Sequence, residues 1–119
     1  MKRLMHSFGY AFRGMGQAFK SEPNMRIHFA IILGVIAGGF LLHISTVEWL
    51  VCILCFGLVI GAELFNTSIE KLVDLVSPEY NPKAGKVKDI SAGAVMVCAI
   101  ISAVIGIIIF APKIWNLLF

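Results

Sequence analysis

Charged residues are absent from two long stretches of the chain, residues 27–47 and residues 90–112. A helix needs about 20 apolar residues to cross a hydrocarbon core about 30 Å thick, because it rises about 1.5 Å per residue. Both stretches reach that length. They predict membrane-spanning helices over 27–45 and 88–112.

A third apolar run extends from Trp49 to Ala62 and is interrupted by Glu63. The helical spacing of apolar residues continues beyond this acid to about Val76. We therefore predict one long helix over 48–75, which crosses the membrane and extends into the cytoplasm. The loop that follows is rich in turn-forming residues, and Lys88 and Asp89 are expected to open the last helix.

The segment 4–20 has the pattern of an amphipathic helix. Its apolar residues recur at helical spacing at Phe8, Phe12, Met15 and Phe19. The opposite face carries His6, Arg13, Gln17 and Lys20. Such a helix is expected to lie in the membrane interface, with its cations near lipid phosphates. Pro23 then ends this surface helix, which serves either as an anchor alone or as part of a site.

Composition agrees with a single membrane-embedded domain, residues 1–119. The chain is 59% hydrophobic and only 14% charged, against about 25% charged for soluble domains. A soluble protein of this size leaves much of its surface in water, so it could not hide this much apolar surface. The predicted fold class is all-α and integral to the membrane. The net charge of +3 is too small to indicate nucleic acid as a partner.

The distribution of cations predicts the orientation. Nine of the ten Lys and Arg residues fall before the first span or between the second and third, and the exception is Lys113. Because positively charged segments stay in the cytoplasm, the N-terminus is expected inside and the C-terminus outside.

Three acids and an amide share one face of the predicted second span. At 100° per residue, Glu70 and Asp74 lie within about 20° of Glu63, and Asn66 lies about 60° away. If Trp49 marks the outer interface, Glu63 is about 21 Å further in and remains inside the hydrocarbon. An acid at that depth costs on the order of 3 kcal/mol. No Lys or Arg lies at a comparable depth, which favours a functional role over a structural salt bridge.

Carboxylates at a membrane boundary also suit Mg²⁺, which one or two carboxylates usually hold together with substrate phosphates. Glu22 is expected at the level of Glu70 and could complete such a site, while Lys83, Lys86 and Lys88 could contact phosphates. The phosphate-binding loop G-x-x-x-x-G-K-[ST] is absent. A small proton-coupled transporter and a structural, holin-like membrane subunit are the alternative functions that these residues leave open.

The acidic face resembles a known family. Its pattern reads Glu63-Leu-x-Asn66-Thr-x-Ile-Glu70-x-x-Val-Asp74, and the resemblance extends to Tyr10, Glu22, Glu79-Tyr80 and Lys88-Asp89. This sequence resembles the prokaryotic diacylglycerol kinase family, which includes the undecaprenol kinases of Gram-positive bacteria. The resemblance implies a homotrimer in the bacterial cell membrane that transfers the γ-phosphate of Mg·ATP to a membrane lipid.

The resemblance also implies residue roles. Glu63 would be the catalytic base that takes the proton from the lipid hydroxyl, and Asn66 would position Glu63 or the substrate. Glu22 and Glu70 would hold Mg²⁺. The residues implied for ATP binding are Arg3, Tyr10, Glu22, Glu70, Glu79, Tyr80, Asn81, Lys88 and Asp89, with Lys88 nearest the transferred phosphate.

The choice of lipid depends on smaller features. The segment from Ser21 to His28 and the stretch from Ile105 to Lys113 look like the undecaprenol kinase branch. The diacylglycerol branch typically carries an acid at the position of His28. The predicted activity is therefore undecaprenol kinase, with diacylglycerol kinase as the alternative.

Overall fold

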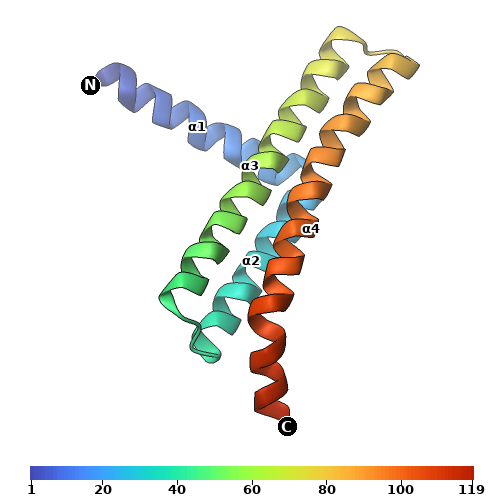
Figure 1. Cartoon of the computed structure of the whole chain (residues 1–119). Coiled ribbons are helices and arrows are strands. Elements are labelled where there is room, and N and C mark those ends of the chain that lie inside the picture. The colour runs from blue at the N-terminus through green and yellow to red at the C-terminus, as the bar shows by residue number, and fades with distance from the viewer.

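The computed structural model describes all residues, 1–119, and consists of four helices without strands. These helices are α1 (Lys2–Ser21), α2 (Pro23–Leu41), α3 (Thr46–Val76) and α4 (Pro82–Leu118). Helices α2, α3 and α4 form an elongated bundle, with the most extensive contact between α3 and α4. Helix α1 branches away from the bundle near the level where α2 begins (Figure 1).

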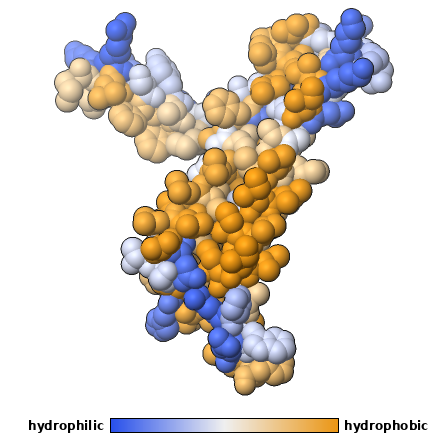
Figure 2. Space-filling view, in the orientation of Figure 1, coloured by the Kyte–Doolittle hydropathy of each residue, from blue (hydrophilic) through white to orange (hydrophobic).

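The bundle has the surface of a membrane protein. Helices α2, α3 and α4 are each long and apolar enough to cross a membrane. Figure 2 shows a hydrophobic band across the middle of the molecule, with hydrophilic residues gathered at the tips of its two arms and at the opposite end. Large side chains within this band, such as Leu58 and Ile107, are exposed. Lipid rather than water is the solvent that such a surface fits.

The last helix is longer than the sequence suggests. Lys88 and Asp89 do not open α4, which begins at Pro82. The side-chain oxygen of Asn81 accepts a hydrogen bond from the backbone N–H of Lys83 at 2.9 Å, and Pro82 takes the first helical position, where its missing N–H costs nothing. The expectation of a loop up to residue 86 was therefore wrong. Pro112 does not end the helix either, which continues to Leu118.

The turn between α2 and α3 also begins earlier than expected. The sequence predicts the first span over 27–45, whereas α2 begins at Pro23 and ends at Leu41. His43 adopts a left-handed backbone conformation, with φ of 52°, and this stops the helix. Ser45 then caps α3: its hydroxyl accepts a hydrogen bond from the Glu48 N–H, and the Glu48 carboxylate accepts one from the Ser45 N–H.

A sharp corner joins α1 to α2. The guanidinium of Arg26 donates hydrogen bonds to the carbonyl oxygens of Phe19 and Lys20, at 2.8 and 2.9 Å, so it satisfies free acceptors at the end of α1. Ala18 and Met25 are buried in this corner. Glu22 is the one residue between the two helices, so the corner determines where its carboxylate lies.

The apolar core lies at the far end of the bundle from this corner. Ile44, Cys52 and Ile109 form it, with Trp49 packed against it. A Cβ atom on Gly39 would lie 2.6 Å from the Trp49 ring, so only glycine lets the indole pack there. Along α3 the buried residues follow one face, namely Cys52, Cys55, Val59, Glu63, Asn66 and Thr67. This face continues from the apolar core directly to the acidic segment.

Candidate functional site

Glu63 is the most deeply buried large side chain of the protein. Its side chain is 2% exposed, and it lies on the packing face of α3, one helical turn beyond Val59. Its Oε1 atom is 3.3 Å from Nε2 of His28 on α2. A carboxylate buried at this position needs a polar or charged partner, because an isolated ion in a low dielectric is strongly destabilising. His28 is that partner.

Polar groups concentrate around Glu63. The buried polar residues of the chain are Glu63, Asn66 and Thr67, which lie close together on α3, and Ser91 on α4. The Thr67 hydroxyl donates to the Glu63 carbonyl at 2.9 Å, which occupies the hydroxyl within the helix. The side-chain oxygens of Asn66 and Ser91 have no hydrogen-bond partner. Unpaired buried oxygens are uncommon in proteins and suit a site that receives a ligand.

Glu70 lies about two turns beyond Glu63 on the same face of α3. Its Oε1 atom accepts a hydrogen bond of 3.4 Å from the Asn66 amide. Asn66 therefore orients Glu70, whereas no hydrogen bond joins Asn66 to Glu63. Glu70 is also close enough to Glu22, Lys88 and Glu63 to interact with each of them electrostatically. The corner between α1 and α2, the acidic face of α3 and the first turns of α4 thus converge on Glu70.

These residues offer oxygen donors for a hard cation. No group of three or more His, Cys, Asp or Glu side chains is arranged to hold a metal ion alone. Glu22 and Glu70 together provide two carboxylates, and the unpaired Oδ1 of Asn66 is a third oxygen beside them. Mg²⁺ usually takes one or two carboxylates and completes its shell with water and phosphates. The donor set fits that mode of binding.

Lys88 is held in place by Asp74. Its ammonium group forms an ion pair with the Asp74 carboxylate and links α4 to the end of α3. Both side chains are partly or largely exposed, so the pair adds little stability by itself. Its consequence is geometric, because it keeps a cation next to the carboxylates.

The other residues predicted to contact a nucleotide lie on two separate arms. Arg3 and Tyr10 are on α1, and the remaining positions are at the α3–α4 turn, namely Glu79, Tyr80 and Asn81. Figure 1 shows the N-terminal end of α1 and this turn pointing away from each other. Tyr80 is 93% exposed, and Asn81 is engaged in capping α4. Asp89 is exposed on α4 beside Lys88. One chain does not bring the two arms together.

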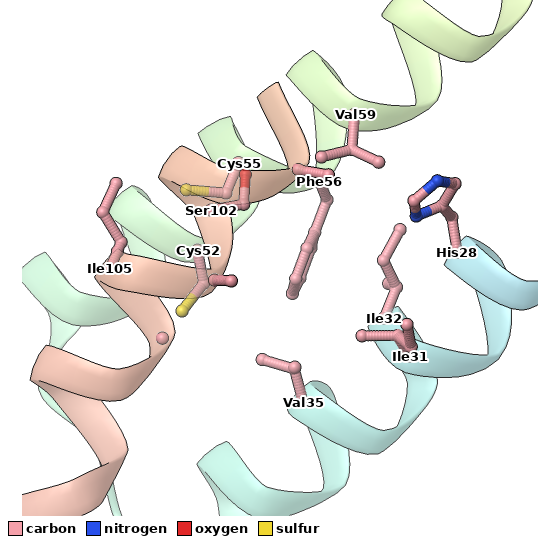
Figure 3. A pocket seen from close by; sticks show the side chains of 13 residues that line it. His28, Ile31, Ile32, Val35, Cys52, Cys55, Phe56, Val59, Ser102 and Ile105 are labelled. Carbon is pink, nitrogen blue, oxygen red and sulfur yellow. The ribbon is translucent and has the colours of Figure 1, made fainter. Parts of the chain in front are cut away.

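An apolar cavity lies beside the acidic site. It has a volume of about 370 Å³, is lined by residues of α2, α3 and α4, and is partly open to the surface. Figure 3 shows Ile32, Val35 and Phe56 around this space, with His28 projecting from α2 near Val59. His28 lines the cavity and also contacts Glu63, so the cavity and the buried carboxylate meet at this side chain.

His28 is the site residue whose contact the sequence did not reveal. Its position at the start of a span suggests a solvated interface residue. In the sequence, its residue type only helped to favour the undecaprenol kinase branch over the diacylglycerol kinase branch. Its side chain is in fact only 20% exposed and faces Glu63. The available signal was Glu63 itself, because an acid at membrane depth without a Lys or Arg partner leaves histidine as the remaining cationic side chain.

A buried carboxylate lies between an apolar cavity and a cluster of carboxylates with a lysine. This arrangement is typical of a membrane-embedded enzyme that acts on lipids. Residues 9–110 match the sequence model of the prokaryotic diacylglycerol kinases. The chain belongs to that family, as its acidic motif indicated, and is a lipid kinase. The transporter and holin-like alternatives are thereby set aside.

Its relatives include both branches of the family. The chain is 41% identical to the undecaprenol kinase of Bacillus subtilis, over 95% of this chain and 92% of the relative. It is 37% identical to a diacylglycerol kinase of Synechocystis, over 97% of this chain and 66% of that relative. The diacylglycerol kinase of Escherichia coli K12 is 26% identical, over 86% of this chain and 84% of its own length.

Proposed function

We propose that this protein transfers the γ-phosphate of Mg·ATP to the hydroxyl of undecaprenol, which gives undecaprenyl phosphate. The observation that carries the proposal is the 41% identity to an undecaprenol kinase along nearly the full length of both chains. The apolar cavity lined by His28, the partner of Glu63, supports it, because an acceptor lipid needs an apolar space for its chain and a base near its hydroxyl.

Glu63 acts as the general base in this proposal. Its carboxylate takes the proton of the lipid hydroxyl while the hydroxyl oxygen forms a bond to the γ-phosphorus of ATP. The bond from that phosphorus to the bridging oxygen breaks, and ADP leaves with the electron pair. The burial of Glu63 supports this role, because water that would compete for the phosphate is excluded from a buried carboxylate.

Glu22 and Glu70 would hold Mg²⁺ with the ATP phosphates, and the ion would supply neutralisation of phosphate charge. Lys88 would contact the transferred phosphate, supported by the way Asp74 fixes its ammonium group beside the carboxylates. Phosphoryl transfer depends mostly on positioning and charge neutralisation, so a site of a few side chains is sufficient.

We propose a homotrimer as the working assembly. The two groups of nucleotide-contacting residues lie on arms that diverge within one chain, which supports a site completed by a neighbouring copy. Arg3 and Tyr10 would contact the nucleotide from one arm, and Glu79, Tyr80, Asn81 and Asp89 from the other.

The proposed location is the bacterial plasma membrane, with the N-terminus inside and the C-terminus outside. The asymmetry of Lys and Arg supports this orientation, in which the carboxylates would lie at the cytoplasmic face, where ATP is available. Helix α1 would lie in the cytoplasmic interface. Its exposed Phe8, Phe12 and Phe19 support that location, because they would otherwise face water.

Diacylglycerol is the alternative acceptor, since two of the relatives are diacylglycerol kinases. The test is transfer of labelled γ-phosphate by purified protein in detergent, with undecaprenol and diacylglycerol offered separately, with and without Mg²⁺. We expect preferential, Mg²⁺-dependent labelling of undecaprenol. Preferential labelling of diacylglycerol would assign the protein to the other branch. If neither lipid is labelled by folded protein, the proposed activity is wrong.

A further inference from the structure

We infer that His28, which lines the apolar cavity, is a positioning residue that holds the neighbouring Glu63 carboxylate in the orientation that the reaction requires. This inference rests on the proposed function, because it assigns His28 a role through the proposed base. Its basis is the contact between the two side chains and their shared place between cavity and acidic cluster.

The first argument is that Glu63 has few alternatives. Its side chain is 2% exposed, so water does not solvate it. The amide of Asn66, which is the nearest polar side chain along the helix face, donates to Glu70 instead. The Thr67 hydroxyl donates to the backbone carbonyl of Glu63 and not to its carboxylate. His28 Nε2, at 3.3 Å from Oε1, is the side chain that pairs with this carboxylate.

The second argument is the position of His28 relative to the cavity. His28 lines the same cavity as Ile32 and Val35 on α2, whose side chains are apolar and face the space between the helices. His28 is the only titratable residue besides the two cysteines among the residues that line it. Glu63 itself does not line the cavity, so His28 is the side chain through which the cavity and the buried carboxylate are in contact. Fixing one carboxylate oxygen through His28 leaves the other free to face the lipid hydroxyl.

The third argument is the rigidity of the His28 backbone. Arg26, two residues earlier, ties the start of α2 to the end of α1 through two hydrogen bonds. Phe29 packs edge-on against Phe19 of α1, with ring centroids 5.7 Å apart. The turn of α2 that carries His28 is thus secured on both sides. A fixed backbone is what a positioning residue needs, because a displacement of about 1 Å can cost about 100-fold in rate.

Two substitutions separate positioning from other roles. His28→Leu keeps a similar volume and an apolar cavity wall but removes the polar partner. His28→Gln retains a donor nitrogen at nearly the same distance from the backbone. With undecaprenol as acceptor, we expect His28→Leu to lower kcat about 10- to 100-fold, with little change in the KM for ATP or for the lipid. His28→Gln should restore most of kcat. His43→Asn, in the turn that follows the opposite end of α2, is the control, because asparagine also tolerates the left-handed backbone found there.

Three results would overturn the inference: an unchanged kcat in His28→Leu, equal loss in the Leu and Gln variants, or a rise in the KM for the lipid alone. An equal loss of kcat in the two variants would indicate that the imidazole itself transfers the proton. A rise in the KM for the lipid alone would indicate that His28 acts only as part of the cavity wall. Thermal unfolding in detergent accompanies each assay. If His28→Leu does not fold, the comparison of His28→Gln with the shorter His28→Asn replaces it.

A second measurement does not depend on turnover. Dicyclohexylcarbodiimide is apolar and modifies protonated carboxyl groups, so its reaction at Glu63 can be followed by mass spectrometry. Loss of the partner should make Glu63 react several-fold faster in His28→Leu, with His28→Gln close to the unmodified protein. An unchanged labelling rate would contradict the pairing. If labelling responds but no lipid is phosphorylated, the pairing stands and the proposed function fails.

Discussion

Helix α3 carries an acid near each end of its membrane span, and the two acids have similar partners in different surroundings. Glu48 lies 3.3 Å from the ammonium of Lys113, and Glu63 lies 3.3 Å from the imidazole of His28. Glu48 is 25% exposed and also accepts a hydrogen bond from the Ser45 N–H, within the capping box that begins the helix. Glu63 is 2% exposed, in the middle of the helix.

The difference separates an acid with a structural explanation from the one proposed as the catalytic base. At the start of a helix, a carboxylate is stabilised by free N–H groups and by the helix dipole, so Glu48 needs no other explanation. Glu63 has neither of these, and Asn66, three residues further along the helix, keeps an unpaired buried oxygen. The position of Glu48 is therefore explained by the start of the helix, whereas the position of Glu63 is not.

The largest expected effect tests this contrast directly. Glu63→Gln removes the base but keeps the shape of the side chain, so we expect kinase activity to fall about 100- to 10,000-fold while the protein still folds. Glu48→Gln is the matched control and should keep near-normal activity. The measurement is phosphate transfer to undecaprenol, together with the oligomeric state in detergent. Near-normal activity of the Glu63 variant would refute the assignment of the base.

Glu70→Ala should act on the metal and not on the base. Removing one of two proposed carboxylate ligands should raise the Mg²⁺ concentration for half-maximal activity about 10- to 100-fold. A titration of activity with Mg²⁺ at saturating lipid measures this. The same titration of Glu48→Ala should match the unmodified protein. An unchanged Mg²⁺ requirement in Glu70→Ala would count against the metal role.

Gly39→Val should affect the other end of the bundle and not the chemistry. Its side chain would collide with the Trp49 ring, and such overpacking costs about 1–3 kcal/mol. We expect a lower midpoint of denaturant unfolding in detergent, with the activity of the folded fraction unchanged. Gly34→Val is the control, because a Cβ at Gly34 meets nothing within 4 Å. Equal stability of the two variants would show that the indole can move aside at no cost.

Ser45→Ala should have the smallest effect. It removes the hydroxyl that accepts from the Glu48 N–H, and loss of such a cap costs about 1 kcal/mol. The expected result is a modest loss of stability in the same unfolding assay, with unchanged kinase activity. A loss of activity comparable to that of Glu63→Gln would end the distinction between the two acids.

The helices and the acidic face could be predicted from the sequence because the membrane limits the choices. Backbone groups in hydrocarbon must be satisfied within the chain, so long uncharged runs are read reliably as helices. The spacing of Glu63, Glu70 and Asp74 then puts them on one face, since the helical period is constant. Helix ends were predicted less well. Asn81 and Pro82 begin α4 through local capping, whereas the prediction relied on the charges of Lys88 and Asp89.

Contacts between helices could not be read from any single segment. Whether His28 faces lipid, water or Glu63 depends on how α2 is rotated about its own axis and on how closely it approaches α3. Both are decided by the corner that Arg26 secures and by packing at the far end, where Gly39 admits Trp49. The periodicity of one helix defines its faces but not their partners. For that reason the acid was visible in the sequence, and its histidine partner became visible only when the helices were packed together.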